Sequence, residues 1–494
     1  MKTRGAVGKS IRILPVKVVI ALALAMSGGR LPRYGGEVRV QVARVPADLD
    51  PLRLRGDEGG LIAGFLYEGL TAMSDGDIEP GIASRWLRDD EGQRWLFQLR
   101  DNVAFHDGVR CDAEAVRSAL ERLADPRQSS YAWLLSSLAG WDDFAAGRSQ
   151  QIEGLYVLQP DQLEIQLTVP LDDLPARLAL PCAGIARRRG DEWLGTGPFR
   201  LESAAPGNLR LTANREHANG RPYVDRIQIV ATTPVPSALE GGAADLARSL
   251  PTDAQPMGAS RWRAGAERLG IAAIQPRSVA LASSTLRRRF ADGFDRSVFV
   301  RAVLSGDGRE TRDLIPLGPK IVTARGVEPQ GDLAMRPQGR VRVITLAGEP
   351  VLRALGERVQ VHLFALGLEA TLDVLAADAY ATAVTTRAYD IVILGWTPPQ
   401  ARSMPLEGAT IPRLLLLDML QPMFGDSLPD GWSSLRRNRD PKDASAVLLK
   451  DEWCIPLVFF HDTWQGSDDL SRLDIGTGSV ALGLANAHFE AGTP

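Results

Sequence analysis

Residues 388–396 read Ala-Tyr-Asp-Ile-Val-Ile-Leu-Gly-Trp, and this stretch decides how the carboxyl-terminal half of the chain is interpreted. The continuous apolar run within Asp390–Gly395 predicts a strand that is buried on both faces, as in a parallel sheet. Trp396 then falls immediately past the end of the predicted strand. Open α/β sheets bind their ligands beyond the carboxyl ends of strands, so Trp396 is a candidate ligand residue.

The residues before this strand alternate between strand and helix patterns. Residues 341–346 and 368–374 are predicted strands, and apolar residues between 352 and 366 recur at helical spacing. Gly367 is expected to end that helix, because glycine adopts the left-handed conformation found after many helices. This part of the chain therefore has an α/β pattern.

The amino-terminal half predicts short strands rich in antiparallel pairs, with few helices. Alternation in residues 37–43 indicates a half-buried strand, and Asp112 is placed to cap a helix that ends before Pro126. Further predicted elements are a helix over 60–70, a hairpin of 154–158 with 163–169, and strands at 94–100, 208–212 and 226–230. The contrast between the two halves favours two lobes.

The amino-acid composition excludes several classes of function. The chain has 494 residues, more than one ordinary domain uses, and 57 Lys and Arg against 60 Asp and Glu give a net charge of −3. That balance provides no field for holding nucleic acid. Five scattered His predict no metal site. Cys111, Cys182 and Cys454 could include one disulfide, but three small buried side chains are the simpler expectation.

The first 27 residues resemble a secretory signal peptide. Five basic residues and no acid precede the apolar run 18–26, and small residues follow it. We expect cleavage after Ala25 or Ser27 and a periplasmic product without a lipid anchor, because no Cys follows the apolar run. The alternative is an amphipathic first helix of a cytosolic domain.

A search for catalytic patterns predicts neither an enzyme nor a cofactor. The sequence has no zinc-binding His-Glu-x-x-His, no Gly-x-Ser-x-Gly and no phosphate loop. His106 lies in a turn and His461 precedes Asp462, but no catalytic partner can be assigned to either. The arginine triples 187–189 and 287–289 are expected to be solvated.

In order along the chain, several segments resemble the extracytoplasmic solute-binding proteins of ABC importers, family 5, which includes oligopeptide- and dipeptide-binding proteins. The segments that carry this resemblance are 49–51, 66–70, 79–86, 95–108, 115–126, 195–199, 214–227, 388–396 and 455–457. The likeness covers nearly the whole mature chain.

The resemblance implies a periplasmic-binding-protein-like α/β fold, type II and cluster C-like, with two lobes joined by a hinge and an additional inserted domain. It places lobe I in residues 36–55, 185–265 and 455–494. The inserted domain is expected at 56–184 and lobe III at 266–454. The implied function is capture of a small peptide or peptide-like solute between closing lobes, followed by delivery to an ABC permease in the inner membrane. Such a protein is expected to be a monomer and to need no cofactor.

The resemblance also assigns ligand residues. Trp396 and Thr397 match the Gly-Trp-x stretch of the family's peptide pocket, and Tyr131 matches an aromatic residue that faces the ligand from the insert. Ala43 and Arg44 match positions that pair with peptide backbones.

One departure from the family pattern bears on the ligand. In peptide-binding members an Asp soon follows Gly-Trp and pairs with the ligand's α-ammonium, whereas here no acid occurs before Glu407. A buried ammonium without a carboxylate is strongly disfavoured. The alternatives to import are therefore a divergent non-transport sensor or envelope scaffold of the same fold and, less favoured, a periplasmic hydrolase.

Overall fold

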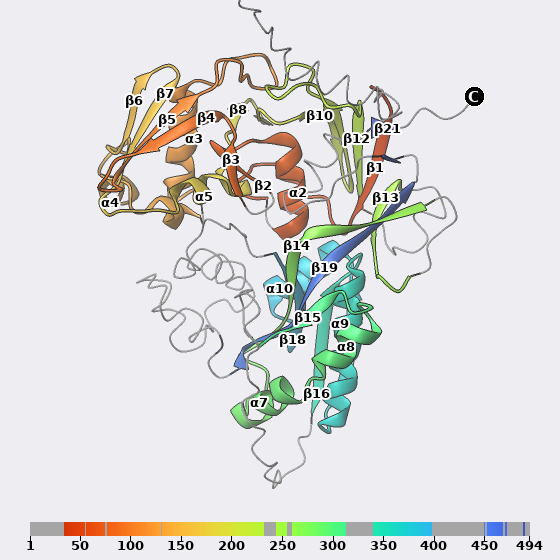
Figure 1. Ribbon diagram of the computed structural model, residues 1–494. Helices are drawn as coiled ribbons and strands as arrows, with labels where there is room; N and C mark the ends of the chain where they lie inside the picture. Colours follow the sequence, from red (N-terminus) through yellow and green to blue (C-terminus); the bar gives the residue numbers. More distant parts are fainter. Residues whose placement is uncertain are drawn as a thin grey trace, which may run out of the picture.

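Figure 1 shows the computed structural model of the protein as three bodies, which we call lobe I, the insert and lobe III. Lobe I lies at the upper right, the insert at the upper left and lobe III below them. The structure describes residues 34–231, 244–253, 259–312, 339–397, 449, 452–467, 470–471 and 488–489, apart from residues 55, 75–76 and 130. The predicted signal peptide lies outside the described residues.

Lobe I is built on β1 (Glu37–Val42), which pairs in parallel with β12 (Arg226–Ala231) and β13 (Leu246–Ser249). The alternation in the sequence places Val38 and Val40 in its apolar core. The antiparallel strands β10 (Phe199–Ala205) and β11 (Asn208–Ala213) extend the sheet beyond β12. The pairs of β1 are thus parallel, whereas the other pairs of the amino-terminal half are antiparallel, which agrees with the expected antiparallel-rich region.

Helix α2 (Gly56–Leu66) packs in the core of lobe I, although its residues lie beyond the predicted boundary at residue 56. The sequence predicted this helix over 60–70, and its end was therefore wrong. Gly69 explains the earlier end. A side chain there would overlap backbone oxygens of Leu178 and Thr71, so the chain turns into β2 (Thr71–Ser74).

The insert contains a four-stranded antiparallel sheet in the order β4-β5-β7-β6, covered by α3 (Ala113–Ala124). Its strands are β4 (Ala83–Arg88), β5 (Arg94–Leu99), β6 (Leu155–Gln159) and β7 (Gln162–Gln166). The Asp112 side chain accepts a hydrogen bond of 2.9 Å from the Ala115 amide, which confirms the predicted helix cap.

Lobe III has the predicted strand–helix–strand pattern. Strand β16 (Arg340–Leu346) lies parallel to β17 (Glu369–Leu375) and β18 (Ile391–Trp396), and α9 (Pro350–Ala365) packs against all three. Gly367, with φ of 88°, follows the helix end as expected. β18 includes Trp396, so this residue ends the strand instead of lying past it, which corrects the prediction.

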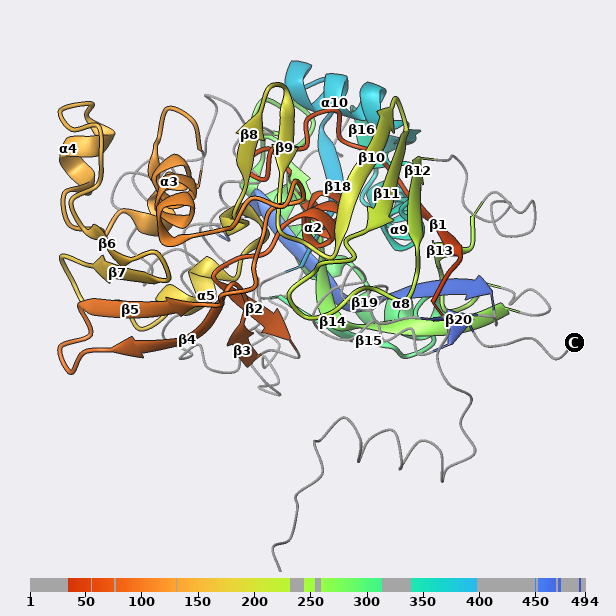
Figure 2. The same cartoon turned by 90° about the horizontal axis from the view of Figure 1, so that it is seen from above.

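Two long antiparallel strands join lobe I to lobe III. β14 (Ala259–Ile274) and β19 (Cys454–Ser467) run from the upper lobe into the lower one in Figure 1 and lie side by side in Figure 2. They complete one sheet in the order β10-β11-β12-β1-β13-β19-β14-β18-β16-β17. The predicted boundaries at 265/266 and 454/455 fall inside these strands. The predicted fold class, two hinged lobes with an additional inserted body, is confirmed.

The remaining elements are short or flank these bodies. They are β3 (Asp77–Pro80), η1 (Ala132–Leu135), α4 (Trp141–Ala145), α5 (Leu174–Leu178), η2 (Pro181–Ala183), β8 (Arg187–Arg189), β9 (Glu192–Leu194), α7 (Ser284–Gly293), α8 (Arg296–Ala302), β15 (Gly308–Glu310), α10 (Ala377–Thr386), β20 (Leu470–Ser471) and β21 (His488–Phe489). Cys111, Cys182 and Cys454 are all buried, as the simpler expectation had it.

Candidate functional site

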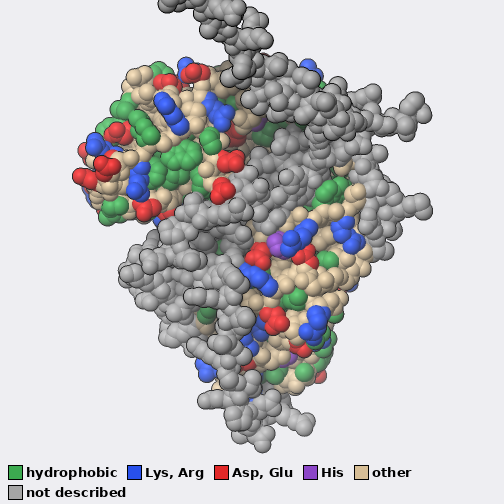
Figure 3. All heavy atoms as spheres, viewed as in Figure 1, with side chains coloured by type: hydrophobic (Ala, Val, Ile, Leu, Met, Phe, Trp, Pro, Cys, Tyr) green, Lys and Arg blue, Asp and Glu red, His purple; other side chains and the backbone are tan. Residues whose placement is uncertain are grey.

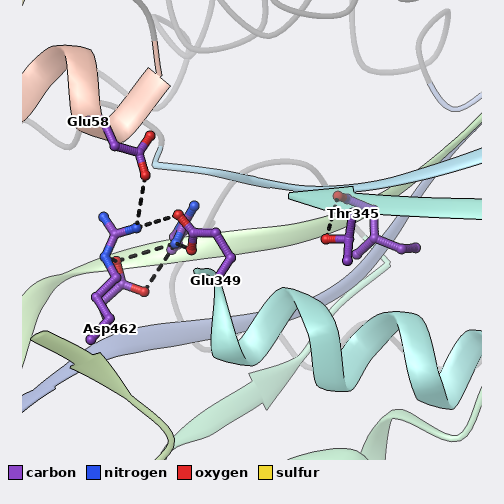
Figure 4. A network of polar contacts seen from close by, with 7 residues as sticks. Glu58, Thr345, Glu349 and Asp462 are labelled. Atoms are coloured by element: carbon purple, nitrogen blue, oxygen red, sulfur yellow. Dashed lines mark hydrogen bonds and ion pairs between the residues drawn. The ribbon is translucent and has the colours of Figure 1, made fainter. Parts of the chain in front are cut away.

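Five charged side chains meet where β14 and β19 pass from lobe I to lobe III, and we call them the hinge cluster. Two come from lobe I, one from lobe III and two from the joining strands. They are Glu58 of α2, Arg248 of β13, Glu349 before α9, Arg268 of β14 and Asp462 of β19. In Figure 4 the carboxyl groups of Glu58, Glu349 and Asp462 surround the two guanidinium groups.

Glu349 occupies the centre of the hinge cluster. One of its oxygens lies 2.5 Å from Nη1 of Arg248, and the other lies 2.7 Å from Nη1 of Arg268. Arg268 also reaches Asp462 at 3.2 Å. Arg248 completes the network with contacts of 3.4 Å to Asp462 and 3.5 Å to Glu58. Glu349 therefore connects an arginine of lobe I with an arginine of the joining strands.

The hinge cluster is removed from water. The side chain of Glu349 is 3% exposed and that of Arg268 is 6% exposed. Burial by itself raises the pKa of Glu349, but the charges of Arg248 and Arg268 and the hydrogen bond from Arg268 lower it to about 2. Glu349 is thus ionised at neutral pH, and both arginines stabilise its charge.

The hinge cluster touches the strand that carries the predicted ligand residues. A Cβ atom at Gly395 would lie 2.6 Å from Cζ of Arg268, so the guanidinium lies directly against this glycine. A larger residue beside Trp396 would therefore have to displace this guanidinium. The Gly-Trp pair of the sequence has a structural reason in this chain.

Ala43 and Arg44 reach the same junction from lobe I. A Cβ atom at Gly348 would lie 3.0 Å from Cα of Ala43, so the end of β1 packs against the residue before Glu349. Arg44 is exposed, and its charge lowers the pKa of Tyr380 on α10 against the larger effect of burial. These contacts bring the two predicted residues beside the hinge cluster.

The predicted aromatic residues lie in apolar surroundings. Trp396 is 7% exposed and belongs to an apolar cluster with members from both the insert and lobe III. Tyr131 is half-buried and packs against the same cluster, while Thr397 follows Trp396 and is half-buried. Trp396 is therefore a packing residue, and its contact with a ligand stays a prediction.

Two surface cavities among the described residues lie elsewhere. One of about 370 Å³ opens on the insert sheet beside Tyr156 and Leu158, and one of about 500 Å³ lies beside His106 and Arg200. Neither is lined by the five predicted ligand residues. On the face seen in Figure 3, acidic and basic side chains are interspersed over the described surface of the insert and lobe III, in agreement with the small net charge.

Sequence reasoning did not identify the hinge cluster. Its members are separated by up to 404 positions, from residue 58 to residue 462. Asp462 had been noted only beside His461, and a stronger signal was available. Arg268 and Asp462 each interrupt or end an apolar strand segment, and a charge inside such a run needs a buried partner.

The described residues offer no group of His, Cys, Asp and Glu suited to a metal ion. No helix in the described part of the chain is both long and apolar enough to span a membrane.

A family model described as "Bacterial extracellular solute-binding proteins, family 5 Middle" matches residues 77–405, more than half of the chain. Among curated proteins, the "Probable D,D-dipeptide-binding periplasmic protein DdpA" of Escherichia coli is 25% identical over 346 residues, which cover 65% of this chain and 66% of DdpA. The matched part is thus just under two thirds of the length of DdpA. For two other curated relatives, it is 30% and 35% of their length.

Solved structures share the fold over nearly the whole chain. The DppA protein of Helicobacter pylori in complex with the peptide STSA has a TM-score of 0.70 at 17% identity, covering 93% of this chain and 99% of DppA. The murein tripeptide binding protein MppA of Escherichia coli has a TM-score of 0.71 at 16% identity, with the same coverages. An MppA structure described as the unliganded open form gives only 0.54 at 17% identity, covering 93% of this chain and 98% of MppA.

Proposed function

This chain belongs to the bacterial extracellular solute-binding proteins of family 5, and on that basis we propose that it is the solute-binding component of an ABC transporter. Its ligand is a peptide or peptide-like solute, captured between lobe I and lobe III. It acts in the periplasm as a monomer, after removal of residues 1–27, and delivers the ligand to a permease in the inner membrane. The names of DdpA and the DppA–peptide complex support this ligand class.

The observation that carries the proposal is the convergence of predicted ligand residues at the hinge. Ala43 packs on the loop before Glu349, and Trp396 ends the strand that pairs with β14. The insert brings Tyr131 to the apolar cluster that contains Trp396. A ligand held between Ala43 of lobe I and Trp396 of lobe III would contact both lobes. Such contact is what couples binding to closure.

A non-transport sensor or scaffold is the weaker candidate. DdpA, DppA and MppA are each described as a binding protein, and each description names a peptide, dipeptide or tripeptide. The missing acid after Trp396 concerns the ligand's ammonium group and leaves transport itself untouched. It does make the free amine the chemical feature to test.

Thermal unfolding of the purified mature protein with peptide pools tests the proposal. A ligand at one hundred times its dissociation constant should add about 2.7 kcal/mol to the free energy of unfolding. Two matched pools, one with free amino termini and one N-acetylated, should differ if an ammonium group is recognised. A chain that no pool stabilises, and that carries no ligand in native mass spectrometry, would contradict the proposed function.

Point variants locate the site. Tyr131→Ala and Arg44→Ala should weaken binding about tenfold or more, because each removes a side chain that the proposal places against the ligand. Tyr156→Ala is the matched control, since Tyr156 is 38% exposed on the insert sheet. Equal affinities for all three variants and the wild type, measured by calorimetry, would remove Tyr131 and Arg44 from the site.

A further inference from the structure

The hinge cluster lies at a break in the ladder between the two joining strands. Arg263 pairs with Thr463 and Glu267 pairs with His461, so residues 264–266 of β14 face only Asp462 of β19. A bulge of this kind interrupts the ladder hydrogen bonds and lets a sheet bend. Asp462, a member of the hinge cluster, is therefore the residue opposite the bending point.

The side chains of the hinge cluster connect the parts that a bend would separate. Glu58 and Arg248 move with lobe I, Glu349 moves with lobe III, and Arg268 and Asp462 sit on the strands beside the break. Rotation about the break would leave Glu349 with Arg268 but would withdraw Arg248, 2.5 Å away.

Burial makes this network sensitive to the angle between the lobes. A buried ion pair adds little net stability when complete, but removing one partner is strongly unfavourable. Intermediate angles would leave Glu349 partly buried with only one arginine. The network therefore favours one particular arrangement of lobe I and lobe III over partly rotated ones.

Lobe III contacts the insert in this structure, because residues of both bodies belong to one apolar cluster. This apolar contact between the insert and lobe III means that lobe III lies close to the other two bodies. The contacts of Glu349 are thus contacts of the closed arrangement.

We propose that the hinge cluster is a latch between lobe I and lobe III, with Glu349 as the residue that stabilises the closed arrangement of the lobes. Arg268 links the latch to the ligand site, because its guanidinium lies against Gly395 on the strand that ends in Trp396. The latch regulates the site of the proposed function, but it acts through the chain's own charges.

Double electron–electron resonance on the ligand-free protein tests the latch. Spin labels at Ser203→Cys in β10 and Val361→Cys in α9 report the separation of lobe I and lobe III, and both positions are exposed. The native cysteines are buried and do not compete for the label. Glu349→Gln should shift the distribution to longer distances and raise the ratio of open to closed molecules about tenfold or more.

A second variant and a matched control keep the test decisive. Arg248→Lys retains the charge but loses the fork that reaches Glu349 and Asp462, so it should open the lobes in the same direction. Asp173→Asn removes the partner of Arg177 within the insert, where the two side chains are 12% and 11% exposed, and should leave the distances unchanged.

The latch is wrong if folded Glu349→Gln and Arg248→Lys proteins keep the wild-type distance distribution. It is also wrong if Asp173→Asn opens the lobes as far as they do. Because no ligand is added, these results are independent of whether the chain binds peptides. A chain that bound no peptide could still show the latch, and a peptide-binding chain could lack it.

Discussion

The junction between lobe I and the insert is packed backbone against backbone, whereas the junction between lobe I and lobe III rests on two strands and five buried charges. At the first, the ring of His106 in the insert lies 3.1 Å from the carbonyl oxygen of Gly197 in lobe I. The His106 amide also donates to the Gly195 carbonyl at 2.9 Å. At the second, the sheet ladder is interrupted opposite Asp462.

The difference indicates where the molecule moves. Backbone atoms in direct contact cannot separate by side-chain rotation, so lobe I and the insert behave as one unit. An interrupted ladder bends more easily, and charged side chains can exchange partners as it does. Motion is therefore expected between lobe I and lobe III. Variants at the first junction should change stability and leave the lobe distances as they are.

The largest expected effect is that of Gly195→Val. A Cβ atom at Gly195 would overlap the carbonyl oxygen of Leu66, and no rotamer relieves a collision with backbone. The free energy of unfolding should fall by about 3 kcal/mol, measured by urea denaturation. Gly60→Ala in α2 is the control. Its nearest neighbour would be 3.8 Å away, so it should be neutral or slightly stabilising. If Gly195→Val were as stable as wild type, the two junctions would not differ in the way described.

A smaller effect concerns His106 at the same junction. Burial lowers its pKa to about 4, although the hydrogen bond to the Gly197 carbonyl at 3.1 Å opposes this. The unfolded chain therefore binds a proton that the folded chain does not between pH 6.5 and 4, and stability is lost as the pH falls through this range. His106→Gln should reduce that loss by about 2 kcal/mol, measured by urea denaturation at pH 7 and pH 4. If the free energy of unfolding fell equally with pH in the variant and the wild type, the assigned role of His106 would be contradicted.

The smallest effect concerns His217, whose contribution to stability should depend on pH in the opposite direction to that of His106. His217 lies 3.0 Å from Glu68, and although burial lowers its pKa, the hydrogen bond and charge of Glu68 raise it above the ordinary value. This pair stabilises the fold below pH 6.5 and loses its contribution as the pH rises through the raised pKa. His217→Gln should cost about 1 kcal/mol at pH 6 and less at pH 8. A cost that grows with pH would reverse this interpretation.

Local sequence patterns predicted many of the elements. Alternation located β1, β5 and the β6–β7 hairpin, and Asp112 with the apolar spacing after it located α3. Each of these signals lies within a few residues along the chain. The end of α2 was wrong because it depends on the close approach of Leu178, which is more than 100 residues away from Gly69.

The arginine residues also show that local sequence cannot predict contacts with distant residues. Residues 287–289 were expected to be solvated, yet Arg287 is buried, lies 3.5 Å from the ring centre of Trp453 and donates to the carbonyls of Leu281 and Ala282. Charge composition cannot distinguish a solvated arginine from one whose donors are met by distant carbonyls. The expectation was wrong for this residue.

By itself, the sequence determined the α/β class, the family and the expectation of hinged lobes, because periodicity and ordered motifs are carried by neighbouring residues. Tertiary structure alone decided that the Arg268 guanidinium lies against Gly395, that Trp396 is packed, and that Glu349 contacts both Arg248 and Arg268. A buried charge needs partners in space, and the positions of those partners are fixed only when the sheet that carries them has formed.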